Sequence, residues 1–324
     1  MPAGITATDG MMYTGETPWH GLGVKLDAPA TSEEAIVAAS MDWDVVTQLI
    51  YVQDGNGAYR LVPNKRAIVR QDTQEVFAVM GEGYMPTQNR TCWAMFDEVI
   101  AQGGAIYHTA GSLFGGRKIW ILAKLPMDIR VGDETIEPFI LLSSSHDGSQ
   151  ALRMQLTPVR VVCANTLSVA LRGSGKNFYA KHTKNILNRA SNARDILGLA
   201  EAYYEMFALQ AERMAETRMT VVEVQEYLQK LYKFQSDKTY ADQHHSKIKA
   251  YETTLDLLSH PTNVLGGMTG TAWAAYNAVT YYIDHERITG GGSDLRDDRR
   301  LNSTWFGSGA ELRQTAYDLL VRAS

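Results

Sequence analysis

Eight basic residues and no aspartate or glutamate occupy the stretch between Asp147 and Asp195. The whole chain has a formal charge of −5, so the residues outside this stretch sum to −13. A local excess of cations in an acidic protein is typical of a surface that binds a polyanion. The alternative is an ordinary solvated face whose acidic partners come from other parts of the fold. The eight basic residues are Arg153, Arg160, Arg172, Lys176, Lys181, Lys184, Arg189 and Arg194.

Two aromatic residues, Phe178 and Tyr179, lie within the same basic stretch. A protein that holds single-stranded nucleic acid needs cations along the phosphates and aromatic or apolar faces for the bases. We therefore predict that the chain binds single-stranded DNA and that it is not an enzyme. The predicted contacts in this stretch are Arg153, Arg160, Arg172, Lys176, Phe178, Tyr179, Lys181 and Lys184. A second group of candidates consists of Arg117 and Lys118 in a glycine-rich hairpin and Lys65, Arg66 and Arg70 on an earlier strand.

One set of residues has the types that nucleophilic catalysis needs. Cys163 follows His146 and Asp147, and a cysteine, a histidine and an aspartate together can form an activated thiolate. The apolar flanks of Cys163 favour a small buried thiol instead, and His146-Asp147-Gly148 is typical of a tight turn whose side chains cap its own backbone. A nucleic-acid- or nucleotide-processing enzyme that uses His146, Asp147 and Cys163 is the second hypothesis. A structural or partner-binding protein is the third hypothesis.

The common cofactor and metal motifs do not occur in the sequence. Residues 173–177 lack the spacing and the final serine or threonine of a phosphate-binding loop. No GxGxxG, GxSxG or HExxH pattern is present, and no cysteine–histidine spacing is typical of structural zinc. We expect neither a cofactor nor a metal ion.

The elements that position these residues change in type along the chain. From Trp43 onward, apolar and polar residues alternate, which predicts strands joined by turns. A helix over 86–102 crosses the strands and ends at a glycine pair. The strand over 151–162 should carry one apolar face and one polar face with Arg153, and a helix can begin at 163–167. The predicted strands are 43–52, 59–70, 75–79, 105–110, 118–124, 127–131, 135–142 and 151–162.

Helical spacing of apolar residues dominates after Lys181. The predicted fold class is α+β, an antiparallel, hairpin-rich sheet with a crossing helix followed by a helical C-terminal half. We divide the chain into a strand-rich domain, 1–184, and a helical region, 185–324. The predicted helices are 31–40, 186–218, 220–234, 244–259, 271–287 and 310–322, with a loop over 290–300.

Composition favours a soluble globular protein, because hydrophobic residues make up 45% and charged residues 21% of the chain. No apolar run is long enough to span a membrane, and the first residues lack the features of a signal peptide. The two cysteines, Cys92 and Cys163, cannot form a disulfide framework. We expect a cytoplasmic location and no membrane partner.

Six short motifs occur along the chain: 15–23 (GETPWHGLG), 110–113 (AGSL), 116–118 (GRK), 146–149 (HDGS), 158–167 (PVRVVCANTL) and 305–307 (WFG). Together they resemble a phage- and plasmid-borne family known as domain of unknown function 932. The resemblance extends over nearly the whole chain and implies a mobile-element origin in a bacterial host cell, with no established catalytic residues; it would make the third hypothesis a structural or partner-binding phage protein. A weaker, fold-level similarity links the predicted architecture to phage single-strand annealing proteins, which are rings or filaments that hold single-stranded DNA.

Self-association is the last expectation. Eight cations in one protomer make a short track for DNA, so a longer groove requires protomers placed side by side in a ring or filament. The pair Trp305-Phe306 and the last helix are predicted to contact a neighbour.

Overall fold

The computed structural model describes residues 10–14, 23–160, 165–166, 178–180, 193–233, 245–261, 268–287 and 296–321. The chain forms two compact units. Unit 1 contains residues 1–126, 140–155 and 176–198, and unit 2 contains 127–139, 156–175 and 199–324. Each unit is built from three segments, because strands β9 and β10 continue from one unit into the other. The domain boundary expected after residue 184 stays a prediction.

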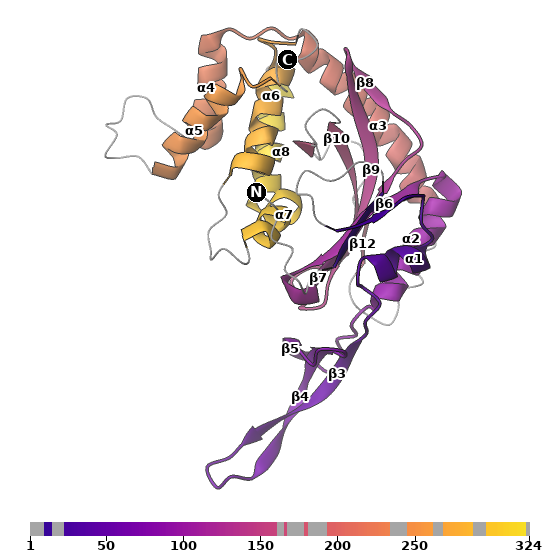
Figure 1. Ribbon diagram of the computed structural model, residues 1–324. Helices are drawn as coiled ribbons and strands as arrows, with labels where there is room; N and C mark the ends of the chain where they lie inside the picture. Colours follow the sequence, from indigo (N-terminus) through magenta and orange to yellow (C-terminus); the bar gives the residue numbers. More distant parts are fainter. Residues whose placement is uncertain are drawn as a thin grey trace. The chain divides into compact units, whose positions relative to one another are not determined.

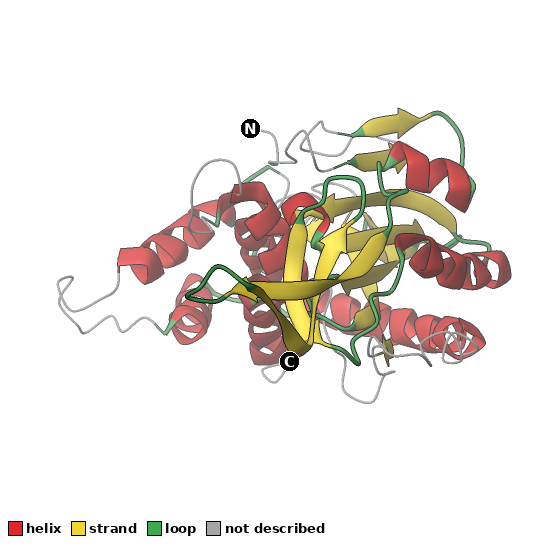
Figure 2. Ribbon diagram, turned by 90° about the horizontal axis from the view of Figure 1, so that it is seen from below, coloured by secondary structure: helices red, strands yellow, loops and turns green. Residues whose placement is uncertain are grey.

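The fold is mixed α+β, with mostly antiparallel sheets in the N-terminal half and helices in the C-terminal half, as the sequence pattern predicts. Figure 2 distinguishes the helices and strands by colour. The larger sheet has the strand order β11-β10-β9-β7-β6-β1-β2, with β12 paired to β10 and β8 paired to β9. Its strands are β1 (Met11–Thr14), β2 (Val24–Leu26), β6 (Ile106–Leu113), β7 (Lys118–Lys124), β8 (Ile129–Val131), β9 (Glu134–Ser145), β10 (Leu152–Arg160), β11 (Asn165–Thr166) and β12 (Phe178–Ala180).

Two helices of unit 1 follow from local sequence signals. Helix α1 (Ser32–Ala38) begins at Thr31, whose side chain accepts from the Glu34 backbone while the Glu34 side chain accepts from the Thr31 backbone. Helix α2 (Asn89–Gly103) ends at Gly104, which has a left-handed backbone conformation, as the glycine pair predicts. The indole of Trp93 packs 4.8 Å from the Tyr107 ring, measured between ring centroids, and joins α2 to β6.

A second, three-stranded sheet of order β3-β4-β5 consists of β3 (Val45–Gln53), β4 (Tyr59–Arg70) and β5 (Val76–Gly81). We call residues 45–70, the hairpin of β3 and β4, the arm. It extends well beyond α1 and α2 of the same unit (Figure 1). The tip closes at Asp54, whose backbone N–H donates to the Ala58 carbonyl at 2.8 Å. An irregularity in β4 between its pairings with Leu49 and Tyr51 separates the tip from the three-stranded part.

The helices of unit 2 surround a core of aromatic residues and alanine. Trp273 and Tyr276 on α6 are buried against Phe207 of α3 and Tyr317 of α8. Thr220 and Glu223 form a capping box at the start of α4, inside the predicted helix 220–234. The helices are α3 (Ala193–Glu216, continuing from unit 1), α4 (Val221–Tyr232), α5 (His245–Leu257), α6 (Ala272–Tyr281), the π-helical turn η5 (Tyr282–Glu286), α7 (Arg296–Phe306) and α8 (Ser308–Val321).

The structure corrects three of the predictions. Residues 296–300, expected in a loop, begin α7, and Asn165–Thr166, expected to start a helix, form β11. The polar face of β10 is not solvated, because Gln155 and Thr157 are buried and the Thr157 backbone donates to the Tyr204 hydroxyl at 3.1 Å. One face of α8, which carries Arg313 and Tyr317, is buried inside unit 2, and the contact of this helix and of Trp305-Phe306 with a neighbour stays a prediction.

No helix in the described part of the chain is long and apolar enough to cross a membrane.

Candidate nucleic-acid interface

One face of the arm presents two tyrosines and two leucines to solvent. Tyr51 lies directly opposite Leu61, and Gln53 lies directly opposite Tyr59. Because cross-strand partners and residues two apart share a face, Leu49, Tyr51, Tyr59 and Leu61 all lie on one side of the hairpin. Their exposed fractions are 48% for Leu49, 52% for Tyr51, 72% for Tyr59 and 48% for Leu61. We call these four residues the tyrosine face; nothing in the described part of unit 1 covers it.

Basic residues accompany the tyrosine face. Arg66 pairs in register with Leu49, so it lies on the same side of the hairpin. Lys65 is exposed, and Arg60 at the tip forms an ion pair with Asp54 at 2.8 Å. The arm contains four cations and one anion, which is a net charge of +3 within a chain of charge −5. Cations beside exposed aromatic rings are the combination that single-stranded nucleic acids bind.

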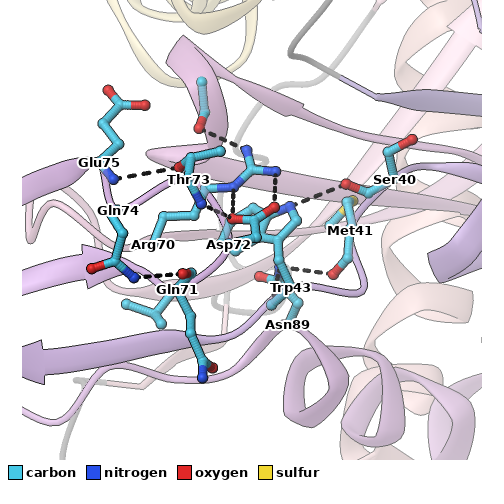
Figure 3. A network of polar contacts seen from close by, with 12 residues as sticks. Ser40, Met41, Trp43, Arg70, Gln71, Asp72, Thr73, Gln74, Glu75 and Asn89 are labelled. Carbon is cyan, nitrogen blue, oxygen red and sulfur yellow. Dashed lines mark hydrogen bonds and ion pairs between the residues drawn. The ribbon is translucent and has the colours of Figure 1, made fainter.

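Arg70, at the base of the arm, has a structural role and is 8% exposed. Its Nε donates to Asp72 Oδ1 at 2.7 Å and its Nη2 to Asp72 Oδ2 at 2.9 Å, a bidentate pair (Figure 3). A third N–H donates to the Gly115 carbonyl, and the guanidinium lies over the Trp43 ring. The guanidinium of Arg70 is therefore committed to the fold, and we omit Arg70 from the proposed interface.

Arg117 is likewise held by neighbours of the arm. Its Nη2 is 2.7 Å from Glu75 Oε1, and its guanidinium carbon lies 5.6 Å from the centre of the Phe77 ring. About a third of its side chain is exposed, so the cation reaches solvent beside a carboxylate that neutralises it. Lys118 is half-buried, and burial lowers its pKa while nearby Asp147 opposes that shift. Both residues lie in the same unit as the arm, at the junction of β6 and β7.

His146 belongs to the packed interior and is completely buried. Its ring stacks on Phe77 and meets Trp43 edge-on. The Asn89 amide donates to the Met41 and Trp43 carbonyls, so the Asn89 Oδ1 accepts the proton carried by His146 Nε2, 2.9 Å away. These contacts fix the β9 end against α2 and the start of the arm.

Asp147 forms the tight turn that the sequence predicts. Its Oδ1 accepts from the Ser149 backbone N–H at 2.9 Å, and Ser145 exchanges hydrogen bonds with Gln150 across the turn. The phenol of Tyr84 lies beside this turn, where burial, with a smaller effect of Asp147, raises its pKa to about 12. The turn thus has a clear structural function.

Of the three residues in the catalytic hypothesis, His146 is completely buried and Asp147 forms the turn described above. Cys163 lies outside the described residues. Cys92 is a buried thiol whose pKa burial raises to about 12, which keeps it protonated and unreactive at neutral pH. The described residues contain no group of three or more histidine, cysteine, aspartate or glutamate side chains placed to hold a metal ion.

Most of the predicted basic stretch lies outside the described residues. Arg153 is on β10 with its side chain half-buried, and it pairs in register with Tyr179 on β12. Phe178 pairs with Met154, and Arg160 ends β10. The residues outside the described ranges are Arg172, Lys176, Lys181, Lys184, Arg189, and motif residues 15–22.

Residues 76–305, which make up 230 of the 324 residues, match a family model with the description Domain of unknown function (DUF932). The chain belongs to this family. Three residues that pack at the base of the arm, Phe77, Asn89 and His146, lie inside the DUF932 segment. The arm itself, residues 45–70, precedes that segment. No curated protein and no solved structure matches the chain.

The sequence search for cations missed Tyr51 and Tyr59. Their signal was nonetheless available, because both flank the Asp54–Gly57 turn in strands whose two faces are equally apolar. A hairpin with apolar residues on both faces and no second layer must expose some of them.

Proposed function

We propose that this DUF932 protein binds single-stranded DNA without catalysis and promotes annealing or recombination for a phage or prophage in the cytoplasm of the bacterial host. The observation that carries the proposal is the tyrosine face of the arm with Arg66 beside it. The acid-free stretch of residues 148–194 supplies further cations to the same protein.

The chemistry of the two groups of residues is complementary. Every base has a π-face, so stacking on Tyr51 and Tyr59 would not depend on sequence, and each stacked base contributes about 1–3 kcal/mol by alanine substitution. Arg66 and Lys65 would neutralise phosphates and release counterions. Arg70 and Trp43 hold the base of the arm, so the tyrosine face projects from a fixed support.

The test is binding of a fluorescently labelled oligothymidylate to the full chain, followed by anisotropy. Replacing Tyr51 and Tyr59 together by alanine should weaken binding at least tenfold, because two stacking platforms are lost. Replacing both by phenylalanine keeps the rings and should keep most of the affinity. As a control for location, Val221 and Val222, two exposed residues at the start of α4, are replaced by alanine. These changes should leave the affinity for the oligonucleotide unchanged.

The proposal requires all three results. Equal affinity of the double alanine variant and the wild type would remove the arm from the interface. Equal weakening by the alanine changes at Val221 and Val222 would show an effect unrelated to the tyrosine face.

A further inference from the structure

Among the strands that the structure describes, β3 is the longest one at the end of a sheet; β5, the other edge of the three-stranded sheet, has six residues and is also uncharged. The larger sheet ends at β2, which has three residues including Lys25, and at β11, which has two. Proteins usually protect edges by such short strands, or by charges, proline or bulges within the edge strand. β3 has nine residues, Val45–Gln53, and none of them is charged, proline or glycine. In the described part of the chain, β3 pairs with β4 alone.

Hydrogen bonds at both ends of β3 show which backbone groups face outward. At one end, the Val45 N–H donates to Gln88 Oε1 at 2.9 Å and the Val45 carbonyl accepts from Gln88 Nε2 at 2.8 Å. At the other end, the Asp54 N–H points inward to Ala58. Since these groups alternate along an antiparallel strand, the N–H and C=O groups of Thr47, Leu49, Tyr51 and Gln53 point outward.

The Gln88 amide makes at Val45 the two bonds that a residue of a neighbouring strand would make. Beyond Val45 the outward row continues for four such positions with exposed side chains. The edge is thus an open template for strand addition.

We infer that β3 pairs antiparallel with β3 of a second copy of this chain, across a twofold axis, to give a continuous six-stranded sheet. An uncharged strand can lie beside itself without repulsion between like charges. At the tip, the exposed Arg60 is paired with Asp54, so the tip carries no net charge. Antiparallel pairing places the tip of each arm beside the base of the other, where Asp42, Asp44 and Glu33 outnumber Arg90, so the two ends do not repel each other.

The symmetry has a consequence for the tyrosine face. Two antiparallel edge strands are related by an axis perpendicular to the sheet, so equivalent faces of both arms lie on the same side. Tyr51 and Tyr59 of the two copies would then form one surface with twice the length. The pairing itself rests on the edge of β3 and does not depend on DNA.

Sedimentation velocity of the full chain without DNA, at micromolar concentration, tests the inference. The wild type should sediment as a dimer. Leu49→Lys places a charge in the centre of the edge and should yield a monomer. Val79→Lys makes the same change at a similarly exposed valine on β5, the other edge of the same sheet, and should remain a dimer.

A second variant tests whether the outward backbone N–H groups of β3 take part in the pairing. Thr47→Pro removes an outward N–H that β4 does not use, so it should also give a folded monomer. A monomeric wild type, a dimeric Leu49→Lys protein, or equal dissociation of Val79→Lys would overturn the inference. None of these outcomes depends on DNA binding, so they leave the test of the proposed function separate.

Discussion

The guanidinium carbon of Arg70 lies 4.3 Å from the centre of the Trp43 ring. The same guanidinium binds both oxygens of Asp72 and the Gly115 carbonyl. One side chain therefore connects the end of β4 with the start of the arm and with the β6–β7 junction. None of the described residues forms a second layer over the outer part of the arm, so these contacts at its base hold its orientation.

Arg70 and Arg66 lie four residues apart on β4, and substitutions at the two positions should affect different properties. Replacing Arg70 should lower stability, whereas replacing Arg66 should weaken DNA binding. Arg70→Met should lower the free energy of unfolding by about 2–4 kcal/mol, because it removes a nearly buried hydrogen-bonded charge. Arg66→Met removes a partly exposed cation and should leave stability within about 0.5 kcal/mol of the wild type, while oligonucleotide binding weakens. Urea unfolding measures the stability of both variants, and fluorescence anisotropy measures their binding of the oligonucleotide. A stable Arg70→Met protein would show that the arm is held in another way.

Gly116 should tolerate no side chain, since its φ is 100° and an added Cβ would lie 2.7 Å from the Trp43 ring. We expect Gly116→Ala to cost about 2–4 kcal/mol, from the left-handed backbone and the overpacked indole together. Gly83→Ala is the matched control, because an added Cβ there meets nothing within 4 Å. Thermal unfolding compares the melting temperatures of the Gly116→Ala and Gly83→Ala variants. Equal melting temperatures would contradict the close packing of Gly116 against the Trp43 ring.

The free energy of unfolding should depend on pH through Asp72. The hydrogen bond from Arg70 holds the pKa of Asp72 below its ordinary value of 3.8. A carboxylate with a lowered folded-state pKa contributes stability that is complete above pH 3.8 and is lost as the pH falls through the folded-state value. Asp72→Asn should thus be less stable than the wild type at pH 7, and the difference should shrink below pH 4. A difference that stays constant between pH 7 and pH 3 would exclude this linkage.

The ion pair of Arg313 and Asp284 in unit 2 offers a test by double-mutant cycle. The Arg313 Nη2 is 2.6 Å from Asp284 Oδ1, and both residues are buried. Arg313→Met should cost about 3–5 kcal/mol because it leaves a buried carboxylate without its partner. The double change Arg313→Met with Asp284→Leu should cost much less than the sum of the single changes. Additive costs in urea unfolding would show that the two residues act independently.

Local signals in the sequence predicted much of the fold correctly. The limits of β4 and β7 follow from alternation between turns, and Thr31, Thr220 and Gly104 mark helix ends by capping chemistry. The start of α7 was missed because Arg296–Arg300 has five charged residues and follows three glycines, which resembles a loop until its partners are known.

The candidate site was less predictable, because burial decides the role of a cation and burial depends on tertiary contacts. Arg66 and Arg70 look alike in an alternating strand, yet one is partly exposed and the other lies over Trp43. The burial of Gln155 and Thr157 depends in the same way on contacts made by distant residues such as Tyr204. Tyr51 and Tyr59 were overlooked since aromatic residues in strands usually pack inside.

The salt dependence of oligonucleotide binding by the wild-type chain tests the central claim most directly. Each phosphate contact on a single strand contributes about −0.7 to the slope of log K against log salt concentration. We predict tight binding at low salt and a steep negative slope, which Arg66→Met and a change of Lys65 to methionine each make shallower by roughly this amount. No binding at low salt, or binding that salt does not weaken, would contradict the proposal that this protein holds single-stranded DNA.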